Sequence, residues 1–266
     1  MKNIVSDIGL YFRMIKLHFR CCTVYRGWSL MLLQTLFVVV TDPISVILLF
    51  LRFGDIGEWS VEKIILVYAL AVASFGLAES FFRGLDYFPW RMVRTGNFDR
   101  LLLRPRPLIL QAASSVFHLH RLPRPLTALA AVFWSLSRQG VVFTARNALI
   151  LLSALLGGFI MYCGVFTLTS GLSFFTVKGL DWIYILTNAS YQVVRCPEPY
   201  IPRTLKGMFS FLLPVLFISF YPAAAICGWG YPAWKAYLAL PAGAAFFMLS
   251  VIVWKIGVRH YTSTGS

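Results

Sequence analysis

Long, unbroken apolar runs are the feature that most constrains what this chain can fold into. Several extend for about 20 residues, the length that a helix needs to cross a hydrocarbon layer about 30 Å thick. Only 13% of the residues are charged, whereas soluble domains have about a quarter. A membrane β-barrel would instead show alternating strands of about ten residues. The sequence therefore predicts an all-α integral membrane protein.

The apolar runs predict six transmembrane helices in a single transmembrane domain over residues 1–266. The predicted spans are 28–50, 64–82, 126–143, 147–170, 205–226 and 237–254. Residues 1–26 form an amphipathic pattern, in which a narrow basic stripe of Arg13, Lys16 and Arg20 adjoins a broad apolar one. This pattern is typical of a helix that lies in the membrane interface. A solvated helix end is the alternative.

The net charge of +14 gives the orientation of the predicted spans. In a soluble protein such a charge would suggest nucleic acid, but in membrane proteins Lys and Arg collect on the cytoplasmic side. If both termini are cytoplasmic, 19 Lys and Arg residues lie inside and 5 outside. The inner set includes Lys178, Arg195, Arg203 and Lys206, because we expect 176–206 to be a cytoplasmic loop. We expect both termini inside and no nucleic-acid partner.

The most polar stretch, GLDYFPWRMVRTGNFDRLLLRPR at 84–106, contains five arginines and two aspartates. It cannot lie in lipid, and we expect 84–125 to be a cytoplasmic region. Asn97 is a competent N-cap, Asp99 suits a first helical turn and Arg104 a last one. Pro105 would stop the helix. The stretch therefore predicts a short cytoplasmic helix, and a solvated loop that only sets the topology is the alternative.

Two carboxylates lie inside predicted spans, where a charge is costly and often functional. Asp42 has two interpretations: it lines a substrate path, or it lies near the outer interface because Pro43 breaks the helix there. Glu79 precedes Arg83 by one turn. We expect Glu79 to pair with a basic neighbour, and we keep it as a second candidate for a substrate path.

Motifs for nucleotide, metal and catalytic sites are missing from the sequence. It has no G-x-x-x-x-G-K-[ST] and no H-E-x-x-H. The five cysteines show no C-x-x-C spacing, and His118 and His120, two residues apart, point to different helix faces. We expect this chain to be neither an enzyme nor a holder of metal or cofactor.

Two segments carry a resemblance to a known family. GNFDRLLLRPRPL (96–108) resembles a G-x-x-D-x-x-L-x-R-P signature, and LPVLFISFYPAAAICG (213–228) resembles a proline-containing fifth span with its outer turn. Together with the order of spans over nearly the whole chain, they are similar to the short permease subunits of type-2 exporters among the ATP-binding cassette transporters of bacteria.

The resemblance implies a dimer of six-span subunits, with an identical or paralogous second permease, in the bacterial cytoplasmic membrane. It implies outward transport by alternating access, driven by two cytoplasmic ATPase subunits that hold the ATP and Mg²⁺. The loop after the second span would be the coupling helix. Its contacts with the ATPase would come from Asn97, Phe98, Asp99, Arg100, Leu101, Leu102, Arg104 and Pro105.

An alternative function is a membrane scaffold or mechanical signalling partner of an ATPase that transports nothing. The sequence is rich in aromatic residues, with 23 Phe, 12 Tyr and 8 Trp. A hydrophobic or amphiphilic solute would suit such an interior, but aromatic side chains are also ordinary lipid-facing residues. The substrate therefore stays open.

Overall fold

A computed structural model describes residues 2–24, 27–55, 57–176 and 181–262. Within these residues every regular element is a helix. The α-helices are α1 (Lys2–Val24), α2 (Trp28–Phe53), α3 (Val61–Phe81), α4 (Phe98–Leu102), α5 (Leu108–Ala113), α6 (Pro123–Arg138), α7 (Ala145–Leu172), α8 (Asp181–Val193), α9 (Arg203–Gly207), α10 (Val215–Ile218), α11 (Phe220–Cys227) and α12 (Ala239–His260). Short 3₁₀ and π turns are η1 (Pro89–Val93), η2 (Leu119–Arg121), η3 (Glu198–Tyr200), η4 (Met208–Leu212) and η5 (Ala233–Leu238).

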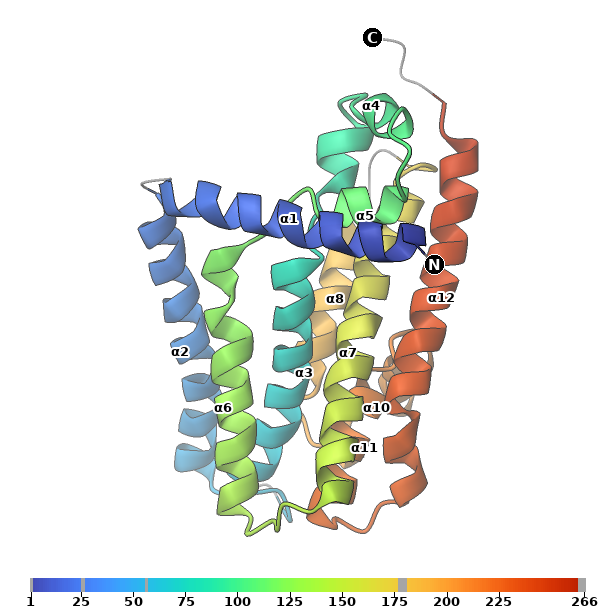
Figure 1. Cartoon of the computed structure of the whole chain (residues 1–266). Coiled ribbons are helices and arrows are strands. Elements are labelled where there is room, and N and C mark those ends of the chain that lie inside the picture. Colours follow the sequence, from blue (N-terminus) through green and yellow to red (C-terminus); the bar gives the residue numbers. More distant parts are fainter. Residues whose placement is uncertain (1, 25–26, 56, 177–180, 263–266) are drawn as a thin grey trace.

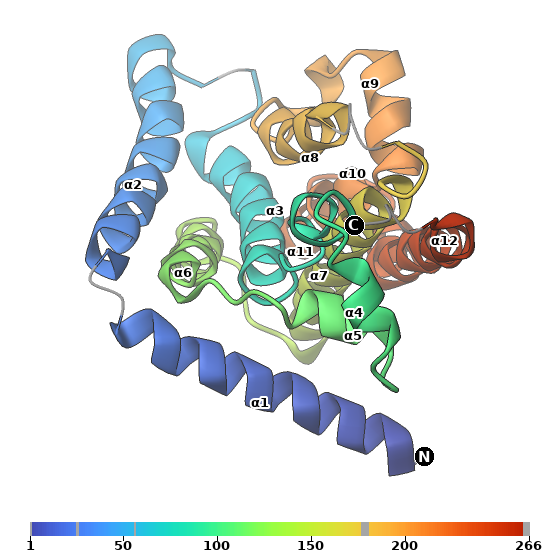
Figure 2. The ribbon, with the colours of Figure 1, turned by 90° about the horizontal axis from the view of Figure 1, so that it is seen from above.

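The long helices form a bundle around α3 (Figure 1). The sequence of α3 is apolar on all sides between Ile64 and Ala78, and it is buried almost throughout. A helix without a polar face is stable only where other helices surround it. Figure 2 shows α6, α7, α8 and α11 around α3.

The bundle has two ends. The α4 end carries α1, α4, α5 and the end of α12, and the opposite end carries the loops 57–60, 139–144 and 228–232 (Figure 1).

The closest helix pair is α7 with α12, and glycines allow the contact. Gly157 and Gly243 face one another, and a Cβ on Gly243 would lie 2.1 Å from the carbonyl oxygen of Gly157. A second contact of this kind joins Gly171 and Gly257, where the corresponding distance is 2.5 Å. Small residues at such positions let helix backbones approach closely. The two helices therefore touch along most of their length.

Among the residues that the structure describes, four helical stretches are long and apolar enough to cross a membrane: α2, α3, α7 and the continuous stretch 233–260. A bent helix pair would make a fifth if it counted as one span. The predicted span 126–143 corresponds to α6, which begins at Pro123 and ends at Arg138. Its 16 residues extend about 24 Å, less than a full hydrocarbon layer. The six-span count therefore stays a prediction, whereas a multi-pass membrane protein fits the structure.

The N-terminal helix α1 lies across the α4 end of the bundle (Figure 1). Tyr11 fixes it there, because its hydroxyl donates a hydrogen bond to the carbonyl oxygen of Phe81 at 2.5 Å. The outward side chains of Phe12 and Leu17 are exposed. An amphipathic helix over this region is therefore present, and its place in the membrane interface stays a prediction.

The segment predicted as a straight span over 205–226 is broken. Residues Arg203–Leu212 and Val215–Cys227 are two helical pieces that meet at 73°. Pro214 lies at the bend. It has no N–H to donate and disfavours a helical conformation in the residue before it. Hydropathy is the same for a straight and a bent segment, so the sequence alone did not show the bend.

Both ends of this bent segment lie at the opposite end of the bundle. Glu198, just before it, forms an ion pair of 2.6 Å with Lys206 and accepts a hydrogen bond of 3.1 Å from Tyr231, just after it. The indole of Trp229 packs on Trp59 of the loop between α2 and α3, with ring centroids 5.2 Å apart. The segment 203–227 is thus a hairpin that enters the bundle and returns.

Residues 176–206 do not form the predicted cytoplasmic loop. Within them α8 packs on α3, where Tyr191 stacks on Phe75 with ring centroids 5.0 Å apart. The chain thus passes from the α4 end, where Ser170 near the end of α7 bonds the carbonyl of Leu85, to Glu198 at the opposite end. Arg195, which contacts Asp42 inside the bundle, and Arg203 and Lys206 of α9 therefore move out of the predicted inner set. Arg26 and Lys178, which the charge count also used, lie outside the described residues.

Candidate functional site

The inner side of α4 is fixed to the bundle by aromatic contacts. Phe98 is fully buried. Its ring centroid lies 4.8 Å from that of Tyr261, 5.1 Å from that of Phe174 and 5.3 Å from that of Phe88. Phe174 follows α7 and Tyr261 follows α12. Because aromatic side chains bury large areas, Phe98 anchors α4 on the ends of both helices.

The outer side of α4 and the turn after it are exposed. Leu102 is 45% exposed and Leu103 is 85% exposed. Arg100, Arg104 and Pro105 are exposed beside them. We call these five residues the α4 surface. An apolar patch rimmed by charged side chains is typical of a protein-binding surface.

The structure changes the roles that the sequence suggested for two apolar residues. Phe98 and Leu101 were expected to contact a partner, but both are buried against their own chain. Leu103, which was not among the predicted contacts, is the more exposed of the two leucines of the α4 surface. Phe98 and Leu101 are three residues apart and therefore share one face of a helix. From this spacing the sequence could have predicted that they are buried together and that Leu102 and Leu103 are exposed.

The predicted helix boundaries are partly correct. Asp99 lies in the first turn of α4. Asn97 precedes α4 but does not cap it with its side chain, which donates to Thr95 Oγ1 at 2.8 Å. Arg104 lies just beyond the helix, in a turn. Its backbone N–H donates a hydrogen bond to the carbonyl oxygen of Leu101 at 3.1 Å.

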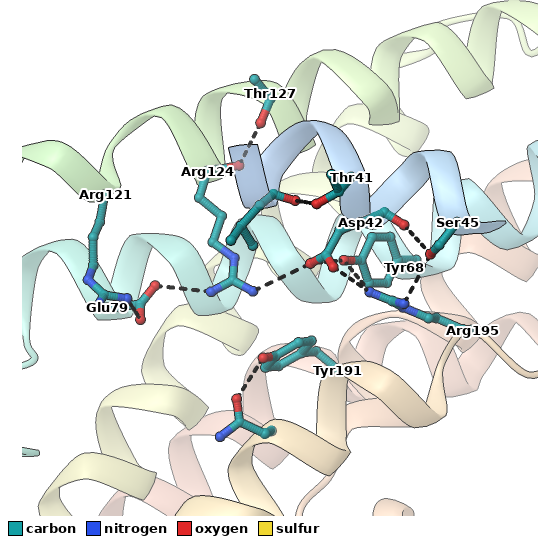
Figure 3. A network of polar contacts seen from close by, with 12 residues as sticks. Thr41, Asp42, Ser45, Tyr68, Glu79, Arg121, Arg124, Thr127, Tyr191 and Arg195 are labelled. Carbon is teal, nitrogen blue, oxygen red and sulfur yellow. Dashed lines mark hydrogen bonds and ion pairs between the residues drawn. The ribbon is translucent and has the colours of Figure 1, made fainter. Parts of the chain in front are cut away.

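A second group of polar side chains lies between α2, α3 and α6 (Figure 3). Glu79 of α3 is 2% exposed and forms ion pairs with Arg83, Arg121 and Arg124. The distance from Arg124 Nη1 to Glu79 Oε2 is 3.3 Å. A buried carboxylate is costly unless it is paired, and these guanidiniums offset the cost. The expected pairing of Glu79 with a basic neighbour is therefore present.

Asp42 belongs to the same network. Its Oδ1 lies 3.3 Å from Arg195 Nη2, and its Oδ2 accepts a hydrogen bond of 3.1 Å from Tyr68. Arg124 Nη2 lies 4.0 Å from the same Oδ2, so one arginine connects Asp42 to Glu79 (Figure 3). Because α2 continues through Pro43, Asp42 sits near the middle of the helix and not at a break.

Arg195 was not recognised from the sequence as part of this network. It follows α8 and reaches α2 and α3 across more than a hundred residues of chain. Its guanidinium lies 4.6 Å from the ring centroid of Tyr68, and Arg124 lies 5.1 Å from that of Phe75. Cation–π contacts of this kind hold arginines in apolar surroundings. No local pattern marks them in the sequence.

Burial changes the ionisation of three groups at the α4 end. It lowers the pKa of His118 to about 3, and the nearby Arg121 and His120 lower it further. Burial lowers the pKa of His120 as well. Burial raises the pKa of Asp86, although Arg83 beside it acts in the other direction. Both imidazoles are thus neutral near pH 7. Among the described residues no three His, Cys, Asp or Glu side chains converge as metal ligands.

Two adjoining hollows border the network. One, of about 100 Å³, lies between α2 and α6 and is bordered by Glu79, Arg121 and Arg124. The other, of about 60 Å³, is mostly apolar and reaches Asp42 and Tyr68. Arg124 lines both. We call the two together the α2–α6 groove. The predicted substrate-path residues, Asp42 and Glu79, thus lie on one groove and remain candidates for that role.

Comparison with known proteins gives one match. The family model described as ABC-2 family transporter protein matches residues 10–265. No curated protein and no solved structure matches the chain.

Proposed function

The chain belongs to the ABC-2 family of transporter proteins, and on this premise we propose that it is the permease subunit of an exporter. In this proposal it moves a solute outward by alternating access. A separate cytoplasmic ATPase, which holds the ATP and Mg²⁺, supplies the energy. A second permease, identical or paralogous, completes a dimer in the bacterial cytoplasmic membrane. Membership of the family supports a role as a membrane transport subunit and association with ATPase subunits.

The observation that carries the proposal is the α4 surface. It presents Leu102 and Leu103 to the outside, although apolar side chains at a cytoplasmic end gain nothing from water. A groove on an ATPase would bury them and pair with Arg100 and Arg104. The buried Phe98 would then pass movement of that ATPase to the ends of α7 and α12.

The test is the double variant Leu103→Asp/Arg104→Glu. Both side chains are exposed, so the change leaves the packing of the chain intact. We expect co-purification of the ATPase encoded beside the permease to fall by about tenfold or more, because a carboxylate would replace an apolar contact and another would reverse a charge.

The matched control is Val142→Asp/Arg138→Glu, which makes the same two changes at the opposite end of the bundle. The control should retain the ATPase. Equal retention by both variants would sink the proposed docking role. The scaffold alternative shares the contact but not the transport. Stimulation of ATP hydrolysis by one of a panel of lipophilic dyes, in the reconstituted complex, would support transport over a scaffold.

A further inference from the structure

The α2–α6 groove has a charged part and an apolar part, and the two share Val39 and Arg124 in their linings. Glu79, Arg121 and Arg124 border its charged part, which lies toward the α4 end. The apolar part continues toward the middle of the bundle between Val39 of α2 and Ala131 of α6. Both hollows are partly open to the outside, and α2 forms one wall of each.

The charged part carries an excess of positive charge. Two guanidiniums, Arg121 and Arg124, share its one carboxylate, Glu79, and Arg83 adds a third guanidinium behind it. In the whole network, four arginines face the carboxylates of Asp42, Glu79 and Asp86. The N-terminus of α6 also lies here without a side-chain cap, and it adds a partial positive charge. An anion would balance this excess.

The apolar part owes its shape to small side chains. Ala69 of α3 and Ala128 and Ala131 of α6 line it, whereas most neighbouring core positions carry larger residues. Val39 and Val72 complete the apolar wall. An apolar hollow lined by small side chains leaves room for part of an unbranched hydrocarbon chain, which would be held there by van der Waals contact.

We propose that the α2–α6 groove binds an anionic phospholipid from the leaflet at the α4 end. The phosphate would lie against Arg121 and Arg124, and one acyl chain would run between α2 and α6 past Ala131. The polarity of the groove matches that of a lipid in this leaflet, with the charged part at the end of the bundle and the apolar part toward its middle. This inference does not depend on the direction of transport or on an ATPase.

The test uses the full-length chain in detergent and native mass spectrometry. The probes are phosphatidylglycerol, phosphatidylcholine of the same acyl chains, and inorganic phosphate. We expect phosphatidylglycerol to bind about tenfold more tightly than phosphatidylcholine, since only the former carries a net charge. Inorganic phosphate should not displace the lipid, because it lacks the acyl chain.

Two variants address the two parts of the groove, each with a matched control. Ala131→Leu fills the apolar part, whereas Ala130→Leu makes the same change at an exposed position of α6. Arg124→Gln removes charge from the groove, whereas Arg138→Gln does so at the far end of α6. We expect Ala131→Leu and Arg124→Gln each to weaken phosphatidylglycerol binding by about tenfold, and the controls to leave it unchanged.

Three results would overturn the proposal. One is equal binding of the charged and the zwitterionic lipid. Another is unchanged lipid binding by Ala131→Leu, a variant whose folding does not depend on the ion pairs. The third is a change of oligomeric state by Ala131→Leu without a change in lipid binding, which would show that a second copy of the chain covers the groove.

Discussion

The contact between α7 and α12 leads to a prediction that the structure makes quantitative. In the variant Gly243→Ala, the new Cβ would lie 2.1 Å from the carbonyl oxygen of Gly157, whereas ordinary van der Waals contact begins at 3.4 Å. The two backbones must therefore separate by about 1 Å at this point. Neither can yield as a flexible side chain would, since both clashing groups belong to helix backbones.

The expected cost is that of overpacking, about 1–3 kcal/mol. Alanine is also a better helix former than glycine by about 1 kcal/mol, which offsets part of this cost. Gly207→Ala is the matched control, because Gly207 is helical and nothing lies within 4 Å of its added Cβ. The difference in the free energy of unfolding between the two variants isolates the clash.

The assay is thermal unfolding in detergent of chains in which the other four cysteines are replaced by serine, because Cys21 and Cys196 are exposed, and it follows the reaction of a fluorogenic dye with the thiol of Cys163. This thiol belongs to α7 and is 3% exposed, so it reacts only when the bundle opens. We expect Gly243→Ala to melt below Gly207→Ala by several degrees, at about 2–4 °C per kcal/mol.

A double variant sharpens the test of the glycine contact. The Cβ of Gly157→Ala would meet the carbonyl oxygen of Ala239 at 2.4 Å, on the same seam between α7 and α12. Once the first alanine has separated the helices, the second should cost less, so the two effects should not add. Equal melting temperatures of Gly243→Ala and Gly207→Ala would refute the reasoning.

Two further predictions concern charge. Glu79→Gln should lower the free energy of unfolding by about 3–5 kcal/mol, because it leaves buried guanidiniums without their carboxylate, whereas Glu58→Gln, at an exposed loop position, should change the melting temperature little. The pKa of His118 is about 3 in the folded chain and near 6.5 in the unfolded chain. The unfolded chain therefore binds the proton first, and stability that is complete above pH 6.5 falls as the pH drops toward 3. His118→Gln should reduce the decrease in the free energy of unfolding between pH 7.5 and 5 by up to about 2 kcal/mol, and an unchanged decrease would argue against a buried neutral imidazole.

The sequence predicted the helical class and most helix positions, because long apolar runs leave few other structures possible in lipid. The bounds of α3 and α7 differ from the predicted 64–82 and 147–170 by three residues or fewer. The sequence did not predict the hairpin at 203–227. An apolar segment has the same hydropathy whether it crosses the membrane or turns back to the end at which it entered. The decisive contacts there, from Glu198 to Lys206 and Tyr231, involve residues outside the apolar run.

The candidate sites show the same division. The sequence pointed to α4 from its local pattern of Asp99, Arg104 and Pro105. It assigned Phe98 outward, because nothing local shows that Phe174 and Tyr261, far away in the chain, meet at this point. From the polar network, the sequence showed the charges of Asp42 and Glu79 and the pairing of Glu79 with a basic neighbour. The contacts of Glu79 with Arg121 and Arg124, and of Asp42 with Arg195, join distant parts of the chain that only folding brings together.

The aromatic anchor of α4 and the glycine seam together determine how far a small movement would travel. Phe98 rests on the ends of α7 and α12, and these two helices are joined backbone to backbone. With 22 residues, α12 is about 33 Å long. If the pair pivots as one stiff rod, a tilt of about 10° at α4 sweeps its far end through about 6 Å, roughly one helical pitch. The length of the α7–α12 pair therefore sets how far its far end moves. A single alanine at one of the glycine contacts would separate α7 from α12, and the two helices would no longer tilt as one body.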